Sequence, residues 1–126
     1  MTFATTSGKE GKCSLPELME EMTMTPEEFR QSLDQQQPPS GLDDVLLGLW
    51  HAGKGEWDRA HRIVQEIPGS DAAWVHAWLH RQEGDDWNAG YWYQRAGRPR
   101  STASLEAEWE EIATALLPRI NVNKEN

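Results

Sequence analysis

Hydrophobic residues recur at helical spacing along most of this chain, in segments bounded by residues that start or stop helices. Six segments carry the pattern: 26–35, 43–52, 56–67, 71–82, 86–96 and 105–117. A shorter helix is predicted over 14–22, where Ser14 precedes a proline in the first turn. We therefore expect an all-α protein, a compact bundle of about five to seven helices arranged as helical hairpins.

Helix-start signals stand before several of these segments. Thr25 and Glu28 are three residues apart around a proline, which is a capping box. Ser70 and Ser104 are expected to cap the helices that follow them. The sequence of 84–86, Gly-Asp-Asp, is expected to end one helix and begin the next.

The predicted helices differ in how their apolar residues are distributed. Segments 43–52 and 71–82 are apolar nearly all round, which is typical of helices buried between two layers. Segment 56–67 has a single apolar side, as surface helices do. In 105–117 the apolar stripe is Leu105, Trp109, Ile112 and Leu116, and the expected solvated face is Glu106, Glu108, Glu110 and Glu111.

A chain of 126 residues is expected to form one domain with a single core. Its composition divides it into a disordered tail over 1–13, N-terminal helices over 14–37, a proline-containing linker over 38–42, helical hairpins with a C-terminal capping helix over 43–118, and a flexible tail over 119–126.

The two predicted hairpins share a sequence template. A shift of 29 residues places 48–51 on 77–80, and Gly55, Ala60 and Gln65 on Gly84, Ala89 and Gln94. Small residues thus recur where helices must approach closely, and glycine recurs at the turn. Over about 43–96 the pattern resembles tetratricopeptide repeats, and 92–96 resembles the end of a Sel1-like repeat. The resemblance implies a compact, tetratricopeptide-like helical domain, although the period is shorter than the ~34 residues usual for that family.

Charge and composition exclude several classes of partner. The 21 acidic and 12 basic residues give a net charge of −9, which disfavours nucleic acid and anionic membrane surfaces. No stretch approaches the ~20 apolar residues of a membrane span. Cys13, the single cysteine, fits a reducing compartment, so we expect a cytoplasmic protein.

One side of 71–82 and its counterpart in 43–52 form a candidate partner-binding groove. Its residues are Val45, Leu49, Trp74, Trp78, Arg81 and Gln82, on the stripe that faces ligands in a tetratricopeptide unit. The alternative is that the N-terminal helix, through Phe29 and Leu33, already covers this stripe.

Four histidines suggest a metal site, namely His51, His61, His76 and His80. Of these, His76 and His80 are four residues apart on one helix face. Against it, no glutamate adjoins the first histidine as in the zincin pattern. His51 and His80 also occupy equivalent repeat positions, as packing would produce. We therefore predict satisfied histidines between helices, with no metal and no cofactor.

Two further groups have both a binding and a packing interpretation. Arg95, Arg98 and Arg100 form a basic cluster that could bind an anion, or could complement the end of their helix. Trp87 and Tyr91 are expected to pack on the C-terminal helix through Trp109 rather than to form an exposed patch.

No nucleophile elbow, phosphate loop or dinucleotide motif is present in the sequence. The leading hypothesis is a non-enzymatic protein–protein interaction or scaffold module with a protein partner, and a homodimer is possible. The second hypothesis is a small-molecule-binding or hydrolytic protein that uses a pocket lined by Trp74, Trp78, His76 and His80.

Overall fold

The computed structural model describes residues 24–117, and within that range the protein is all-α, with no strands. Its helices are α2 (Pro26–Gln31), the single 3₁₀ turn η1 (Ser32–Asp34), α3 (Asp44–Gly53), α4 (Trp57–Gln65), α5 (Ser70–Gln82), α6 (Asp86–Ala96) and α7 (Leu105–Leu116). The all-helical prediction is confirmed. The predictions for 1–23 and for the chain after 117 lie outside the described residues.

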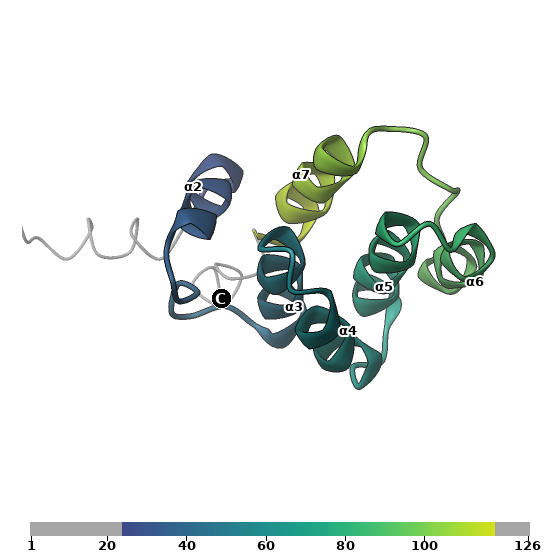
Figure 1. The fold of residues 1–126 in the computed structure, drawn as a ribbon, viewed down its shortest axis with the longest axis horizontal. Helices are drawn as coiled ribbons and strands as arrows, with labels where there is room; N and C mark the ends of the chain where they lie inside the picture. The colour runs from purple at the N-terminus through teal and green to yellow at the C-terminus, as the bar shows by residue number, and fades with distance from the viewer. Residues whose placement is uncertain (1–23, 118–126) are drawn as a thin grey trace, which may run out of the picture.

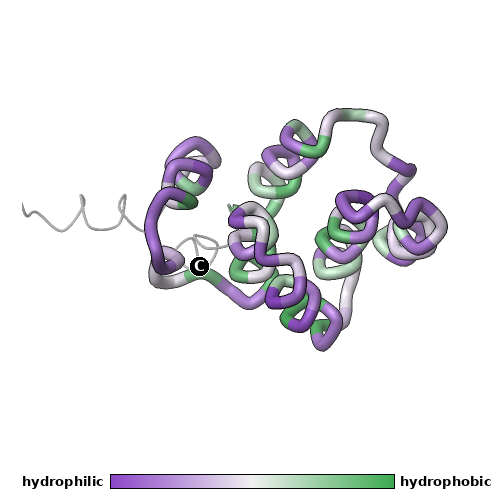
Figure 2. Tube along the Cα trace, in the orientation of Figure 1, coloured by the Kyte–Doolittle hydropathy of each residue, from purple (hydrophilic) through white to green (hydrophobic). Residues whose placement is uncertain are grey.

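The helices pack as antiparallel neighbours in chain order (Figure 1). Helix α3 pairs with α4, α4 contacts α5, and α5 pairs with α6. The chain then returns, so that α7 lies across α3 and α5, while α2 packs against α7. Figure 2 shows that α2 is largely hydrophilic, whereas hydrophobic positions interrupt the tubes of α3, α5 and α7.

Helix α5 is the centre of the fold. Residues 72–80 are all buried, because α4 and α6 cover one side of the helix and α7 covers another. Leu46, Leu49 and Trp50 of α3 are buried as well. Both helices that are apolar nearly all round are therefore internal, as predicted.

Side chains at the helix starts explain most of the boundaries. Thr25 and Glu28 form the predicted capping box, and Ser104 accepts a hydrogen bond from the N–H of Ala107. The Ser70 prediction was wrong, since Ser70 is the first helical residue of α5. The preceding residue, Gly69, has a φ of 108°, a backbone conformation that glycine adopts readily, and it offers no capping side chain.

The small residues of the repeat permit close helix contact. A Cβ atom at Gly48 in α3 would lie 2.6 Å from Cγ1 of Val64 in α4, too close for any side chain without movement. Ala77, the equivalent residue in α5, is fully buried. This agrees with the prediction that the template places small residues at helix crossings.

Five of the seven tryptophans fasten one element to another through the indole N–H. The bonds run from Trp50 to Ser32, from Trp57 to Leu79, from Trp74 to Glu108, from Trp78 to Leu105 and from Trp109 to Leu49. The rings are therefore structural, and the high tryptophan content mainly serves the core and its polar ties.

The prediction for Trp87 and Tyr91 was wrong. Their side chains are 76% and 44% exposed on the outer side of α6. Trp109, their expected partner, instead stacks on Phe29 of α2 with ring centres 5.3 Å apart. The cause is the position of α7, which crosses α5 and α3 and does not pack closely on α6.

Candidate functional site

Three histidines meet between α4 and α5, and we call them the histidine cluster: His61, His76 and His80. His61 comes from the middle of α4, and the other two lie one turn apart on α5. One nitrogen from each ring can be chosen so that all three nitrogens lie within 4.8 Å of one another. His76 and His80 are buried and His61 is half-buried, so the cluster lies just beneath the surface.

Hydrogen bonds and stacked rings fix the orientation of these imidazoles. The Nε2 atoms of His61 and His76 are 2.9 Å apart, so one donates and the other accepts. His80 Nδ1 lies 2.8 Å from the Glu83 carboxylate. Two indoles flank the cluster. Trp57 stacks on His61 with ring centres 4.7 Å apart, and Trp92 stacks on His76 with ring centres 3.8 Å apart.

The surroundings keep two of these rings neutral. Burial lowers the pKa of His76 to about 3, with smaller contributions from the neighbouring His61 and His80. Burial also lowers the pKa of His61, and His80 adds to the effect while Glu83 and Asp58 oppose it. At neutral pH each of these two imidazoles therefore keeps one unprotonated nitrogen that can accept a hydrogen bond or bind a metal.

The sequence indicated only part of this arrangement. The four-residue spacing correctly placed His76 and His80 on one face of a helix. It gave no sign that His61 joins them, because that contact depends on the packing of α4 on α5. His51, the repeat equivalent of His80, lies elsewhere and forms its own pair with Glu56 at 2.6 Å.

The predicted groove stripe is covered by the chain itself. Leu49, Trp74 and Trp78 are buried, and Val45 is half-buried against the core. The covering element is α7, which supplies acceptors for both indoles, and not the N-terminal helix considered above. This stripe is therefore not an open groove, and only its edge at Gln82 is exposed.

Arg81 and Trp74 belong to a second polar cluster, which we call the Glu108 network. The side chain of Glu108 is 1% exposed and accepts hydrogen bonds from Arg81, Trp74 and Tyr93 at 2.6 to 3.1 Å. The guanidinium of Arg81 also donates to the carbonyl of Ala103. Burial is the main cause that raises the pKa of Tyr93, and the hydrogen bonds and negative charge of Glu108 raise it further.

The assignment of Glu108 to a solvated face was wrong. Glu108 follows Leu105 by three residues and precedes Ile112 by four, so it lies on the apolar stripe of α7. That spacing was a usable signal. The structure also does not bring together the four residues of the pocket expected in the second hypothesis. Trp74 and Trp78 face α7, while His76 and His80 face α4 and α6.

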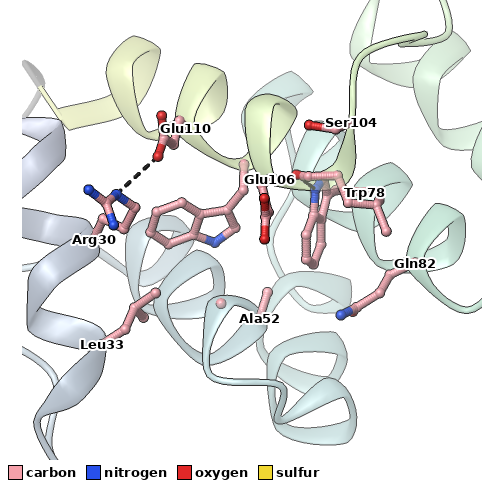
Figure 3. Close-up of a pocket in the computed structure, with 11 residues that line it drawn as sticks. Arg30, Leu33, Ala52, Trp78, Gln82, Ser104, Glu106 and Glu110 are labelled. Carbon is pink, nitrogen blue, oxygen red and sulfur yellow. Dashed lines mark hydrogen bonds and ion pairs between the residues drawn. The ribbon is translucent and has the colours of Figure 1, made fainter.

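A cleft of about 650 Å³ lies where α2, α3 and α7 meet (Figure 3). Its lining comes from Arg30, Leu33, Ala52, Gly53, Trp78, Gln82, Ser104, Leu105, Glu106, Trp109 and Glu110. Arg30 reaches across the opening to Glu110, at 3.0 Å. Two residues of the predicted groove, Trp78 and Gln82, thus contribute to a cleft that sequence analysis did not place.

The three arginines of the predicted anion site do not converge. Arg98 lies 3.4 Å above the ring of Trp74, whereas Arg95 lies over the rings of Tyr91 and Trp92. Arg98 and Arg100 line one shallow depression of about 290 Å³, and Arg95 lines a different one. Anion binding by Arg98 and Arg100 stays a prediction, and cation–π contacts already explain two of the three side chains.

Among the described residues, no helix is long and apolar enough to cross a membrane. Comparison of the chain with family models, with curated proteins and with solved structures gave no match.

Proposed function

We propose that this protein is a non-enzymatic interaction module that binds a short peptide segment of a partner protein in the cleft between α2, α3 and α7. The observation that supports the proposal best is the composition of this cleft. Leu33, Ala52, Trp78 and Trp109 give it an apolar floor, and charged or polar side chains surround the opening. Binding sites for short segments commonly combine an apolar floor with a few polar groups at the edge.

The floor is held in place before any partner arrives. Trp109 donates its indole N–H to the carbonyl of Leu49 and stacks on Phe29. Trp78 donates in the same way to the carbonyl of Leu105. Rings fixed in this manner lose little freedom when a ligand binds, which favours affinity.

The charges around the opening indicate the chemistry of the segment. Glu106 and Glu110 stand on the α7 side of the cleft, and the facing cation, Arg30, is already paired with Glu110. The whole chain carries a net charge of −9. The expected segment therefore has an apolar anchor side chain and basic neighbours, because opposite charges speed and stabilise docking.

The resemblance to tetratricopeptide units supports the same role. Trp78 and Gln82 belong to the stripe that would face the ligand in such a unit, and both line the cleft. We therefore propose both that the chain is related to tetratricopeptide proteins and that its partner is a protein.

The experiment is a selection of peptides from a random display library, followed by affinity measurement with two matched variants. Gln82→Trp places a large ring at the cleft, and Gln94→Trp adds the same ring to an exposed position on α6. We expect the first variant to weaken binding at least about tenfold and the second to leave it unchanged. Equal binding by all three proteins would contradict the proposal.

A second pair of variants tests the charge of the segment. Glu106→Lys reverses an acid at the opening, while Glu111→Lys makes the same change at an exposed position of α7 outside the cleft. Selected basic peptides should bind the first variant more weakly than the second, and the difference should shrink as salt is added. Selection of acidic or wholly apolar peptides would contradict the assignment of the segment.

A further inference from the structure

We propose that His61, His76 and His80 bind one divalent transition metal ion of the zinc class, with Glu83 orienting His80. This inference does not depend on the peptide cleft. The cleft is lined from α2, α3, α7 and the end of α5, whereas the histidine cluster lies between α4 and α5 beside α6.

The nitrogens are near the positions that a metal ion requires. Zinc–histidine bonds are about 2.0–2.1 Å long, so tetrahedral ligands place their nitrogens about 3.3 Å apart. The three ligand nitrogens lie within 4.8 Å of one another. The pair formed by His61 and His76, now 2.9 Å apart through a hydrogen bond, needs to separate by only about 0.4 Å.

The outer contacts of the cluster resemble those that orient metal ligands. A histidine that binds a metal through one nitrogen usually donates from the other nitrogen to a carboxylate or carbonyl. His80 Nδ1 lies 2.8 Å from Glu83 Oε2, which leaves Nε2 of His80 as the ligand atom. The rings of Trp57 and Trp92 hold the other two imidazoles by stacking.

The donor set selects the class of metal. Three imidazoles suit zinc, cobalt, nickel and copper, whereas magnesium and calcium prefer oxygen ligands. Three protein ligands leave a fourth position, which solvent can supply because His61 is only half-buried. An alternative set of His80, Glu83 and Asp85 is less suitable. Both carboxylate oxygens of Asp85 already accept hydrogen bonds from Asn88 at the start of α6.

Packing alone does not require three histidines at one point. His51 shows what packing requires at the equivalent place in the first hairpin, namely one buried ring with one carboxylate partner, Glu56. The cluster instead brings together three rings, of which two share one hydrogen bond and the third bonds to Glu83. A metal ion satisfies all three nitrogens at once.

The test uses the full chain without a polyhistidine tag, stripped of metal and titrated with Zn²⁺ by calorimetry and with Co²⁺ by visible absorption. We expect one equivalent of either ion to bind, and Co²⁺ to give the intense visible bands of a four-coordinate site. His61→Gln should weaken binding by at least about 100-fold, and Glu83→Gln by about 10-fold, as loss of an orienting contact does.

Two controls separate this site from other ligands. His51→Gln removes a buried, carboxylate-bonded histidine outside the cluster and should leave the affinity unchanged within about twofold. Cys13→Ser should do the same, since the proposed site uses no thiolate. The proposal is overturned if the wild-type chain binds neither ion, or if His61→Gln binds as tightly as wild type.

Discussion

Two polar clusters lie on opposite sides of α5, and they differ in how their hydrogen bonds are satisfied. In the Glu108 network a single carboxylate accepts from Arg81, Trp74 and Tyr93, so each donor has an acceptor and the two charges balance. In the histidine cluster three like groups face one another, and the hydrogen bond between His61 and His76 satisfies only one nitrogen of each.

The difference separates a structural role from a binding role. A buried network in which every group has its partner fixes one arrangement of the surrounding helices. The Glu108 network does this by attaching α7 and the preceding loop to α5 and α6. In the histidine cluster, by contrast, neutral rings keep unprotonated nitrogens, and three of the ring nitrogens lie within 4.8 Å of one another, so the cluster can supply ligands to a metal ion. The following predictions test this contrast, from the largest expected effect to the smallest.

Glu108→Gln should cause the largest loss of stability. The substitution leaves Arg81 as a poorly paired, largely buried charge, and the free energy of unfolding should fall by about 3 kcal/mol or more. Urea unfolding measures this. The matched control is Glu111→Gln at an exposed position of the same helix, which should change stability by less than about 0.5 kcal/mol. A loss below about 1 kcal/mol for Glu108→Gln would show that the network is not structural.

Acidification should destabilise the metal-free chain through His76. In the folded state the pKa of His76 is about 3, below its ordinary value of 6.5. At pH values between 3 and 6.5 the unfolded state therefore binds more protons than the folded state. Stability is therefore retained above about pH 6.5 and lost as the pH falls below it, by about 2 kcal/mol between pH 7 and pH 5.

The comparison for this pH effect is His76→Gln, which removes the titrating ring. Urea unfolding at several pH values should give a smaller loss for the variant than for wild type over the same interval. Burial also lowers the pKa of the neighbouring His61, so that ring contributes to the residual slope of the variant. Parallel curves for the two proteins would mean that burial of His76 does not oppose its protonation.

Tyr93→Phe should have a smaller effect, because it removes one donor from Glu108 and leaves Arg81 and Trp74 in place. The expected loss is about 1 kcal/mol, the usual size for one buried hydrogen bond. Thermal and urea unfolding check it, and a loss as large as that of Glu108→Gln would show that the hydroxyl, not the ion pair, dominates the network.

Trp87→Ala should have the smallest effect. The ring is 76% exposed, so its removal should change the free energy of unfolding by less than about 0.5 kcal/mol. A loss above about 1 kcal/mol would show that the ring is packed in the folded protein, as the sequence pattern predicted.

Local sequence signals predicted the helices well and the contacts between them poorly. The capping box at Thr25 and the cap at Ser104 join residues that are only three apart in the chain. Both could therefore be predicted from the local sequence alone. The burial of Glu108 was predictable from its place on the stripe of α7. The joining of His61 to the histidine cluster was not, because it depends on how α4 sits on α5.

The position of α7 relative to the other helices could not be predicted from the sequence either. Whether Trp87 or Phe29 packs on Trp109 is decided by where α7 crosses the other helices. Both choices bury an aromatic ring, so hydrophobic spacing does not distinguish them. The cleft between α2, α3 and α7 follows from the same crossing. For this reason only Trp78 and Gln82, and Leu33 in the alternative interpretation, were associated with one another from the sequence.

The most direct measurement of the contrast is the free energy of unfolding with and without Zn²⁺ buffered at about 100 times its Kd. Wild type and Tyr93→Phe should each gain about 2.7 kcal/mol, because the metal binds the folded state and the Glu108 network takes no part. His61→Gln, whose binding is at least about 100-fold weaker, should gain no more than about 0.4 kcal/mol at the same concentration. An equal gain in His61→Gln, or no gain in wild type, would contradict the assignment of the histidine cluster as a metal site.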